Sequence, residues 1–292
     1  MSLQKKIAIG TILTAAIITI WFGGNRSVLT GNLTAMEEST EIPILLLHHM
    51  VQDEPVMSES TISLEYFEDL LSTLHSEGFQ TIEFDKLIAY TENKGELPKK
   101  PIIITFDDGY ESTIVLAKPV LEQYHMQATV FAIGGSVGKT TYKDTGIPIT
   151  PHFTWEQVAE ARNVISVQSH SYDMHHVRQL DLQDFRSGVL RKESENASIY
   201  RKAFRKDIAR FKKDMRTNLH TTVKVFAYPY GLYTETSESM LKEAGFKATV
   251  TTEHGINHVT KGDPDSLYAM KRIEVTQDIP LNQLMKWLSD TH

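Results

Sequence analysis

The stretch "PIIITFDDGY", residues 101 to 110, decides how the rest of the chain is interpreted. Its apolar and β-branched residues run into Phe106, which is typical of a strand buried on both faces of a parallel sheet. Two carboxylates, Asp107 and Asp108, follow side by side, and a glycine comes next. Adjacent like charges at the end of a buried strand repel each other, so the sequence predicts a positive partner for them.

Outward from this stretch, short apolar runs alternate with helical patterns. One helix is expected from an N-cap at Ser63 to a stop at Gly78, and a capping box of Thr154 and Gln157 opens another. Strands are predicted at 42–49, 102–106, 128–133, 163–170, 223–231, 247–252 and 271–275. Further helices are predicted at 110–125, 234–246 and 280–290, and a long amphipathic helix is predicted to end at about 215. Strict alternation without a repeat predicts an α/β fold with a parallel sheet, open or closed into an irregular (β/α) barrel.

The N-terminus predicts a separate segment. Lys5 and Lys6 precede an uncharged apolar run at 7–24. Residues 1–24 are therefore expected to form a membrane anchor or a signal segment, with the anchor favoured because no good cleavage site follows. The lysines favour a cytoplasmic N-terminus and place the rest outside. Polar residues 25–41 are predicted to be a linker, and 42–292 a single domain.

Composition excludes several classes of function. The chain has 292 residues and a net charge of −7, which does not favour nucleic-acid binding. It has no cysteine, which excludes disulfides, thiolate metal ligands and a Cys nucleophile. Basic residues cluster between Arg186 and Arg216, and we interpret them as the solvated face of a helix.

Polar residues follow four of the predicted strands. They are His48 and His49, then Asp107 and Asp108, then His170 and His175, then Tyr230. The carboxyl ends of parallel strands meet on one face, so these side chains are expected to converge there. One Asp and two His make a three-ligand metal site with an open position, and the metal would offset the paired carboxylates. Alone, "DDG" is more often a turn and a His pair is more often structural; their convergence favours a site.

At these residues the sequence resembles the polysaccharide deacetylases of carbohydrate esterase family 4, which have the NodB-like fold. The resemblance lies in "TFDDG" at 105–109, "SHSYDMHH" at 169–176 and "FAYPYG" at 226–231, and it covers roughly 42–288. Within this family, the sequence resembles most strongly the poly-β-1,6-N-acetylglucosamine N-deacetylases of biofilm formation. That branch implies an irregular barrel that is circularly permuted.

The resemblance implies a role for each motif residue. Asp107 would be the general base and His48 the general acid, with His49, His254 and His258 as weaker candidates for the acid. His49 is also a candidate for binding the substrate. Asp108, His170 and His175 would hold a divalent metal, most often Zn²⁺ in this family. The backbone N–H of Tyr230 would help to bind the oxyanion.

Two features depart from the family pattern: the arginine of the third motif and the strand that carries the acid. The family usually has the acid on a late "LxxH" strand, whereas here it would lie in "ILLLHH" at the front of the domain. Ala227 stands where the family usually has an arginine that orients the base, and Arg272 is a candidate substitute. Trp155, Tyr172 and Tyr230 could provide aromatic surfaces for sugar rings, although core packing is the alternative for Trp155. The Gly-rich segment 134–153 is either a substrate-side loop or a plain surface excursion.

The sequence therefore predicts metal-dependent N-deacetylation of an extracellular N-acetylglucosamine polymer, with poly-β-1,6-N-acetylglucosamine favoured. One alternative is peptidoglycan or another wall polysaccharide that bears N-acetylglucosamine. Another is an inactive carbohydrate-binding protein on the same fold. The expected location is the extracellular face of the bacterial cell membrane, or secretion if the N-terminal segment is cleaved.

Overall fold

The computed structural model describes residues 39–53, 55, 58, 60–143, 145–176 and 186–289. The predicted anchor at 1–24 and most of the predicted linker lie outside these residues. Within the described part of the chain, no helix is both long enough and apolar enough to cross a membrane.

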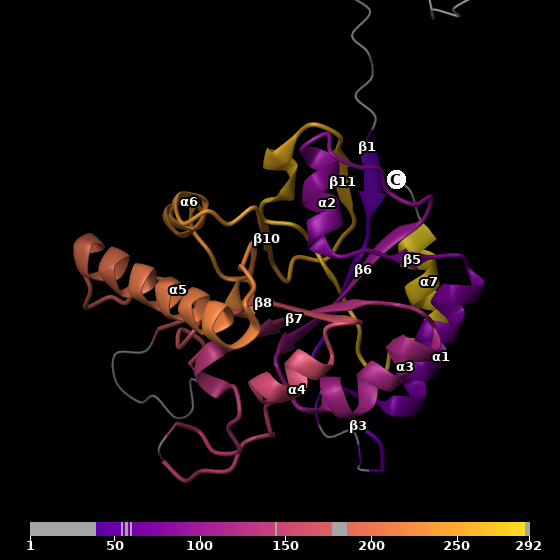
Figure 1. Cartoon of the computed structure of the whole chain (residues 1–292), viewed down its shortest axis with the longest axis horizontal. Helices are drawn as coiled ribbons and strands as arrows, with labels where there is room; N and C mark the ends of the chain where they lie inside the picture. The colour runs from indigo at the N-terminus through magenta and orange to yellow at the C-terminus, as the bar shows by residue number, and fades with distance from the viewer. Residues whose placement is uncertain are drawn as a thin grey trace, which may run out of the picture. The chain divides into compact units, whose positions relative to one another are not determined.

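An eight-stranded parallel sheet forms the centre of the fold (Figure 1). Seven of its strands lie in the order β10 (Ala248–Val250), β9 (Val225–Ala227), β8 (Ile165–Ser169), β7 (Ala128–Ala132), β6 (Pro101–Asp108), β2 (Ile44–Leu47) and β12 (Ile273–Glu274). The eighth, β5 (Gln80–Thr81), pairs with the start of β6. Every pairing is parallel, which confirms the predicted α/β fold.

The sheet curls until its edges approach each other. A parallel bridge joins Val250 of the edge strand β10 to Met270, just before β12 at the opposite edge. The first long strand, β2, lies between β12 and β6, so the two ends of the domain meet inside one sheet. This arrangement carries the residues that follow β2 to the same edge as those that follow β6. The circular permutation itself stays a prediction.

Helices surround the curled sheet (Figure 1). They are α1 (Leu64–Ser76), α2 (Phe84–Thr91), α3 (Lys118–Gln123), α4 (Trp155–Glu160), α5 (Ala197–Leu219), α6 (Glu235–Glu243) and α7 (Leu281–Ser289). The predicted caps are confirmed: Ser63 accepts a hydrogen bond from the N–H of Tyr66, and Thr154 and Gln157 form a reciprocal capping box.

The two faces of the sheet bury separate apolar clusters. On β6, Ile102, Ile104 and Phe106 belong to the larger cluster, whereas Ile103 belongs to a smaller one with Phe131. Side chains alternate between the faces of a strand, so a strand buried on both faces reads as one continuous apolar run. The run before Asp107 is apolar for this reason.

Several predicted elements divide in the structure. The expected strand 42–49 is divided among three strands: β1 (Ser39–Ile42), β2 and β3 (His49–Val51). β1 pairs antiparallel with β11 (Asn257–Thr260), and β3 pairs with β4 (Thr61–Ser63). β1 therefore takes in the last three residues of the predicted linker. The division follows Pro43, which has no N–H for a sheet ladder.

The expected helix 110–125 is also interrupted. It consists of a π-helical turn, η1 (Thr113–Ala117), followed by α3. Pro119 lies in the first turn of α3. Proline cannot donate a backbone hydrogen bond and its ring crowds the carbonyl four residues earlier, so a regular α-helix cannot run through this point. Helix α2 and the short strands β4, β5 and β11 were not predicted.

Candidate active site

The end of β6 turns both carboxylates toward one place. Adjacent side chains of a strand face opposite sides, but Asp108 has a left-handed backbone with φ +70° and Gly109 follows at φ +86°. Asp107 Oδ2 and Asp108 Oδ1 consequently lie 3.8 and 3.7 Å from the same atom, Nε2 of His170. A left-handed conformation is unfavourable for a residue with a Cβ, and such strain is concentrated at functional sites.

Arg272 supplies the positive partner that the sequence requires. It is 1% exposed, and its Nη1 and Nη2 donate to Oδ1 and Oδ2 of Asp107, each at 2.7 Å. Its Nε donates to the carbonyl of Thr251 at 2.7 Å, and Nη1 also reaches the hydroxyl of Thr105 at 3.2 Å. The two-pronged contact fixes the plane of the Asp107 carboxylate. The family's usual arginine is replaced by Ala227 in this chain, and Arg272 makes the contact to the base that we expected from a substitute.

Burial and charge act in opposite directions on the two aspartates. Burial would raise the pKa of Asp107, but the charge of Arg272, followed by His170 and His48, outweighs it and lowers that pKa well below its usual range. Burial likewise opposes ionisation of Asp108, and His175, His170 and His48 together lower its pKa below the ordinary value. Both carboxylates are therefore ionised at neutral pH.

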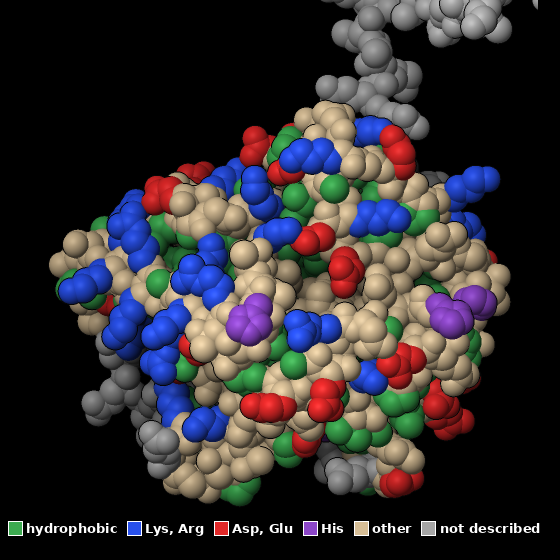
Figure 2. Space-filling model, in the orientation of Figure 1, with side chains coloured by type: hydrophobic (Ala, Val, Ile, Leu, Met, Phe, Trp, Pro, Cys, Tyr) green, Lys and Arg blue, Asp and Glu red, His purple; other side chains and the backbone are tan. Residues whose placement is uncertain are grey.

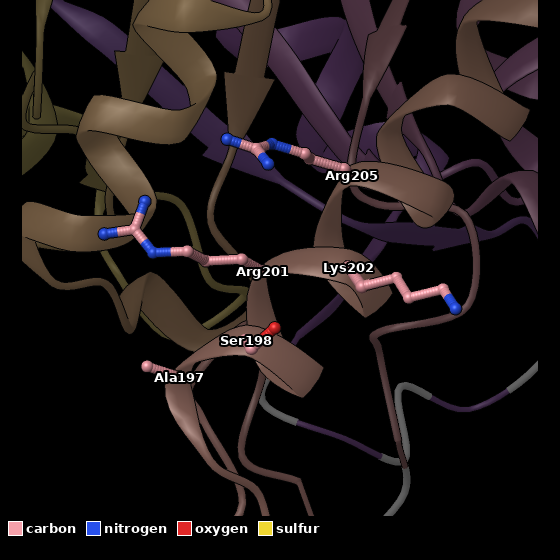
Figure 3. Close-up of a pocket in the computed structure, with 5 residues that line it drawn as sticks. All are labelled: Ala197, Ser198, Arg201, Lys202 and Arg205. Carbon is pink, nitrogen blue, oxygen red and sulfur yellow. The ribbon is translucent and has the colours of Figure 1, made fainter.

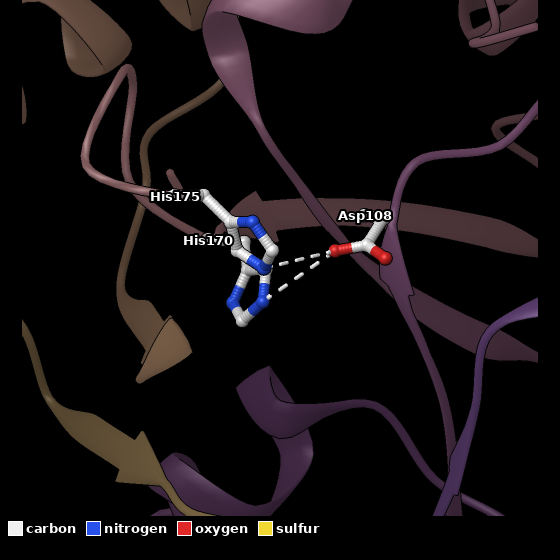
Figure 4. Close-up of side chains that lie close together, drawn as sticks. All are labelled: Asp108, His170 and His175. Carbon is white, nitrogen blue, oxygen red and sulfur yellow. Dashed lines mark ion pairs between the residues drawn. The ribbon is translucent and has the colours of Figure 1, made fainter. Parts of the chain in front are cut away.

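Asp108, His170 and His175 form a cluster with the composition of a metal site (Figure 4). Asp108 Oδ1 lies 3.7 Å from Nε2 of His170 and 3.3 Å from Nε2 of His175. A tetrahedral site with bonds of about 2.0–2.1 Å separates its ligand atoms by about 3.4 Å, so this spacing fits a small divalent cation. A turn after β8 spans the five-residue separation between the two histidines.

The protonation of the cluster also fits a metal. Nδ1 of His170 lies 2.8 Å from the carbonyl oxygen of Ala227, so Nδ1 carries the proton and Nε2 presents a lone pair. Burial lowers the pKa of His170 to about 4, against the charges of Asp107 and Asp108, which keeps the ring neutral. Oδ1 of Asp108 is buried and accepts no hydrogen bond among the described residues. A buried carboxylate oxygen without a partner is costly unless it binds a cation.

The two histidines after β2 lie in different surroundings. His48 is half-buried and lies near enough to Asp107 and Asp108 for its charge to lower the pKa of both. His49 instead places Nδ1 2.9 Å from the hydroxyl of Ser112, and its ring packs against Tyr110 at 5.2 Å. This geometry is compatible with His48 as the proton donor and gives His49 a contact to the turn after β6.

The aromatic residues divide between the site and the core. Tyr230 is 46% exposed, its ring lies 4.7 Å from that of His175, and its hydroxyl donates to the carbonyl of His176 at 2.8 Å. Its backbone is left-handed at φ 59°. Trp155 instead packs against the larger core cluster, in keeping with the core-packing alternative.

The weaker candidates for the acid lie elsewhere. His254 packs edge-on against Trp287 at 5.0 Å, and His258 is an exposed residue of β11 opposite Glu41. The described contacts of these two histidines do not include either aspartate. Of the histidines predicted as candidates for the acid, His48 therefore remains the one that lies near the carboxylates.

The basic cluster seen in the sequence lies along α5. Lys and Arg side chains gather over this helix (Figure 2), and its eight basic residues are all exposed or half-buried: Arg201, Lys202, Arg205, Lys206, Arg210, Lys212, Lys213 and Arg216. Three of them line an open pocket with Ala197 and Ser198 on the first turns of α5 (Figure 3). Within α5 this is a solvated helix face, as the sequence predicted, but Arg186 at the start of the predicted cluster is buried and pairs with Glu195 before the helix begins.

Sequence reasoning missed two residues beside the site. Tyr110 lies between His49 and His152, and burial, reinforced by the charge of Asp108, raises its pKa far above the usual value. Asp207 is a buried residue of α5 that binds the turn between His170 and His175. A signal for Asp207 was present, because an acid interrupts the apolar face of an amphipathic helix between Phe204 and Phe211.

Known proteins resemble this chain in sequence and in fold. A 27% identical relative, poly-beta-1,6-N-acetyl-D-glucosamine N-deacetylase of Staphylococcus aureus strain MRSA252, aligns over 78% of this chain and 72% of its own. IcaB from Ammonifex degensii superposes with a TM-score of 0.67 at 25% identity, covering 85% of this chain and 97% of that one. A de-N-acetylase from Aggregatibacter actinomycetemcomitans has a TM-score of 0.73 at 20% identity, covering 85% and 100%, and shares the fold.

The sequence model of one family, described as polysaccharide deacetylase, matches residues 94–249, more than half of the chain. The matched range contains Asp107, Asp108, His170 and His175. This protein belongs to the polysaccharide deacetylase family, whose members are hydrolases that act on amide bonds of acetylated polysaccharides.

Proposed function

We propose that this enzyme removes acetyl groups from N-acetylglucosamine residues of an extracellular polysaccharide, with poly-β-1,6-N-acetylglucosamine as the favoured substrate. The observation that carries the proposal is the convergence of Asp108, His170 and His175 beside the arginine-bound carboxylate of Asp107. The Staphylococcus aureus relative bears the name of an enzyme with this substrate, and it supports the choice of polymer.

Asp108, His170 and His175 would hold a divalent cation, with Zn²⁺ favoured because two imidazoles and one carboxylate suit it. When bound, such a cation supplies Lewis-acid chemistry that lowers the pKa of water and polarises an amide carbonyl. The protein contributes by lowering the pKa of His170 and of Asp108, which leaves both groups deprotonated and able to bind a cation.

Asp107 is the group in this site that accepts a proton. Both of its oxygens are held by Arg272, so the carboxylate is ionised and fixed before the substrate arrives. It would take a proton from the water that attacks the acetamide carbon. His48 would return a proton to the amine nitrogen as the C–N bond breaks, giving acetate and a free amine on the sugar.

Two residues would act on the substrate itself. The backbone N–H of Tyr230 would donate to the oxyanion, and one such donor is worth about 3 kcal/mol in other hydrolases. The exposed ring of Tyr230, packed against His175, offers a surface to a sugar next to the reacting one. Trp155 has a smaller place in this proposal because it packs on the core.

We place the enzyme at the extracellular face of the cell membrane, tethered by residues 1–24, or secreted if that segment is cleaved. The lysines at 5 and 6 and the apolar run at 7–24 support this location.

The test is acetate release by the full chain loaded with Zn²⁺. Oligomers of β-1,6-linked N-acetylglucosamine, chitin oligomers and peptidoglycan would be compared, each with Asp107→Asn as the inactive control. Release confined to the β-1,6 oligomers supports the proposal. Release only from peptidoglycan or chitin oligomers would replace the polymer, and no release from any of the three would overturn the proposed substrate class.

A further inference from the structure

The turn that carries His175 requires support from outside itself. It leaves β8 through Ser171, which has a left-handed backbone at φ 69°, and reaches His175 four residues later. A non-glycine residue in this conformation persists only when surrounding contacts hold it. The contacts that hold the turn therefore determine where the His175 ring lies relative to Asp108 and His170.

Asp207 of α5 binds the middle of this turn with both carboxylate oxygens. Its Oδ1 accepts from the N–H of Tyr172 and its Oδ2 from the N–H of Asp173, each at 2.7 Å. The next N–H, that of Met174, donates to the hydroxyl of Ser171 at 3.1 Å. Three successive backbone donors of the turn are thus satisfied, and a side chain remote in sequence supplies two of the acceptors.

A second contact from α5 holds the same turn by its side chain. The guanidinium of Arg210, one helical turn after Asp207, lies 4.2 Å from the centre of the Tyr172 ring. On the opposite side, the N–H of Gly135 donates to the carbonyl of Tyr172 at 2.7 Å. A Cβ on Gly134 would approach the rings of Tyr172 and Phe211 to 2.6 and 2.8 Å, so β7, the turn and α5 meet without spare room.

The stability of the fold does not explain an aspartate at position 207. It is 8% exposed on a face of α5 otherwise made of buried residues such as Phe204, Ile208 and Phe211. Among the described residues, no Lys or Arg forms an ion pair with it. A buried carboxylate is costly where an apolar side chain would pack, so its two bonds to the turn are the property that distinguishes it.

We infer that Asp207 is a positioning residue for the metal ligand His175, which makes the geometry of the metal site depend on helix α5. The inference rests on the proposed function, because it assumes that Asp108, His170 and His175 bind the cation. It assigns a task to a residue that touches neither the metal ligands nor the reacting atoms.

The test measures metal affinity in the full chain, by competition with a chelator for Zn²⁺ and by the visible absorption of Co²⁺. Asp207→Ala removes both acceptors, and we expect a loss of affinity of about 10–100-fold, the range known for groups that orient metal ligands. The Co²⁺ bands should also shift. Asp207→Asn keeps one acceptor, so its loss should be smaller, and its near-isosteric shape guards against a folding defect.

Asp214→Asn is the matched control. It removes a carboxylate two helical turns after Asp207 that, among the described residues, accepts no hydrogen bond from the turn. It should leave the affinity and the Co²⁺ bands unchanged. If Asp207→Ala is folded by circular dichroism and binds both metals like the wild type, the inference is wrong. If the His175→Ala and Asp108→Ala variants bind metal like the wild type, the proposed metal site itself is wrong. The two failures are thereby distinguished.

Discussion

At the scale of single residues, the site depends on how one buried ion pair is arranged. Both terminal nitrogens of Arg272 bind Asp107, and among the described residues no donor binds Oδ1 of the neighbouring Asp108. Two adjacent residues of the same type are thus given different electrostatic partners. One carboxylate is neutralised by a guanidinium, and the other faces the two imidazoles of the proposed metal site.

Asp107→Asn should abolish turnover without abolishing metal binding. The amide cannot accept a proton, and general acid–base groups contribute about 10²–10⁴-fold to rates. Acetate release should fall by at least this order, whereas Zn²⁺ affinity should stay within a few-fold, because Asp107 is not in the metal cluster. Asp69→Asn on α1 is the control and should behave like the wild type. Substantial activity in Asp107→Asn would show that another group is the base.

Arg272→Met should destabilise the fold and shift the pH profile. Removing one partner of a buried pair typically costs about 3–5 kcal/mol, because the other charge is left without compensation. The pKa of Asp107 should rise once the charge of Arg272 is gone, so the acidic limb of kcat/KM should move to higher pH. Urea unfolding and a pH–rate profile measure the two effects.

The exposed pair of Arg205 and Glu243, at 3.2 Å, provides the control for Arg272. Arg205→Met should cost less than about 1 kcal/mol and leave the pH profile in place. The double variant Arg272→Met with Asp107→Asn should recover part of the stability lost by Arg272→Met alone. A double variant as unstable as the sum of the single ones would argue against coupling between the two side chains.

At the scale of elements, the two faces of α5 lie in different environments. Its outer face carries eight basic residues in solvent, and its inner face packs on the sheet and binds the turn after β8. The end of β8 and the end of β6 carry left-handed non-glycine residues at Ser171 and Asp108. Each of these side chains therefore follows a regular strand, but an irregular backbone conformation sets its direction. Contacts with neighbouring residues stabilise that conformation.

The stability of the fold should depend on pH through Asp207. Burial raises its pKa to about 6, opposed by the N–H groups of Tyr172 and Asp173, whereas an unfolded aspartate titrates near about 4. The native state therefore binds more protons between about pH 4 and pH 6, and the free energy of unfolding contributed by this group falls as pH rises through that window.

Asp207→Asn removes that titration, so its stability relative to the wild type should improve between pH 4.5 and pH 7. A shift of about two pKa units corresponds to at most about 3 kcal/mol. Urea unfolding of both proteins at the two pH values gives the difference directly, and effects of other titrating groups cancel in it. A stability difference that is the same at both pH values would contradict a raised pKa for Asp207.

At the scale of the whole molecule, the curled sheet makes one site from segments spread along the chain. His48 follows β2, the aspartates end β6, the metal histidines follow β8, and Arg272 precedes β12. These positions span more than 220 residues, and they meet because β12, β2 and β6 are neighbours and the bridge at Val250 brings β10 near. The active site thus depends on closure of the sheet rather than on any local motif.

Removal of metal should therefore affect stability as well as activity. A ligand that binds only the native state at 100 times its Kd stabilises it by about 2.7 kcal/mol. Chelation should abolish acetate release and lower Tm, and added Zn²⁺ should restore both. The control is His175→Ala, whose Tm should hardly respond to the chelator. A wild-type Tm that is unchanged by complete removal of metal would contradict a metal bound by these buried residues.

The sequence by itself determined the parts of the molecule whose signals are local. The apolar run before Asp107 predicted a strand buried on both faces, and hydrophobic periodicity with Ser63, Thr154 and Gln157 predicted two helix starts that are observed. The polar residues at the strand ends predicted the convergence of Asp108, His170 and His175, whereas His49 contacts Ser112 instead. These inferences succeed because burial, capping and the direction of parallel strands are properties of short stretches of chain.

Only the tertiary structure decided which partners these residues find. Arg272 is 165 residues from Asp107 in sequence, and Asp207 is 34 and 35 residues from the N–H groups that it binds. These sequence separations leave no periodic signal, because the contacts arise from the curl of the sheet and from the packing of α5 against the turn after β8. The same holds for the left-handed backbone at Asp108, which turns two adjacent carboxylates to one side although a regular strand would separate them.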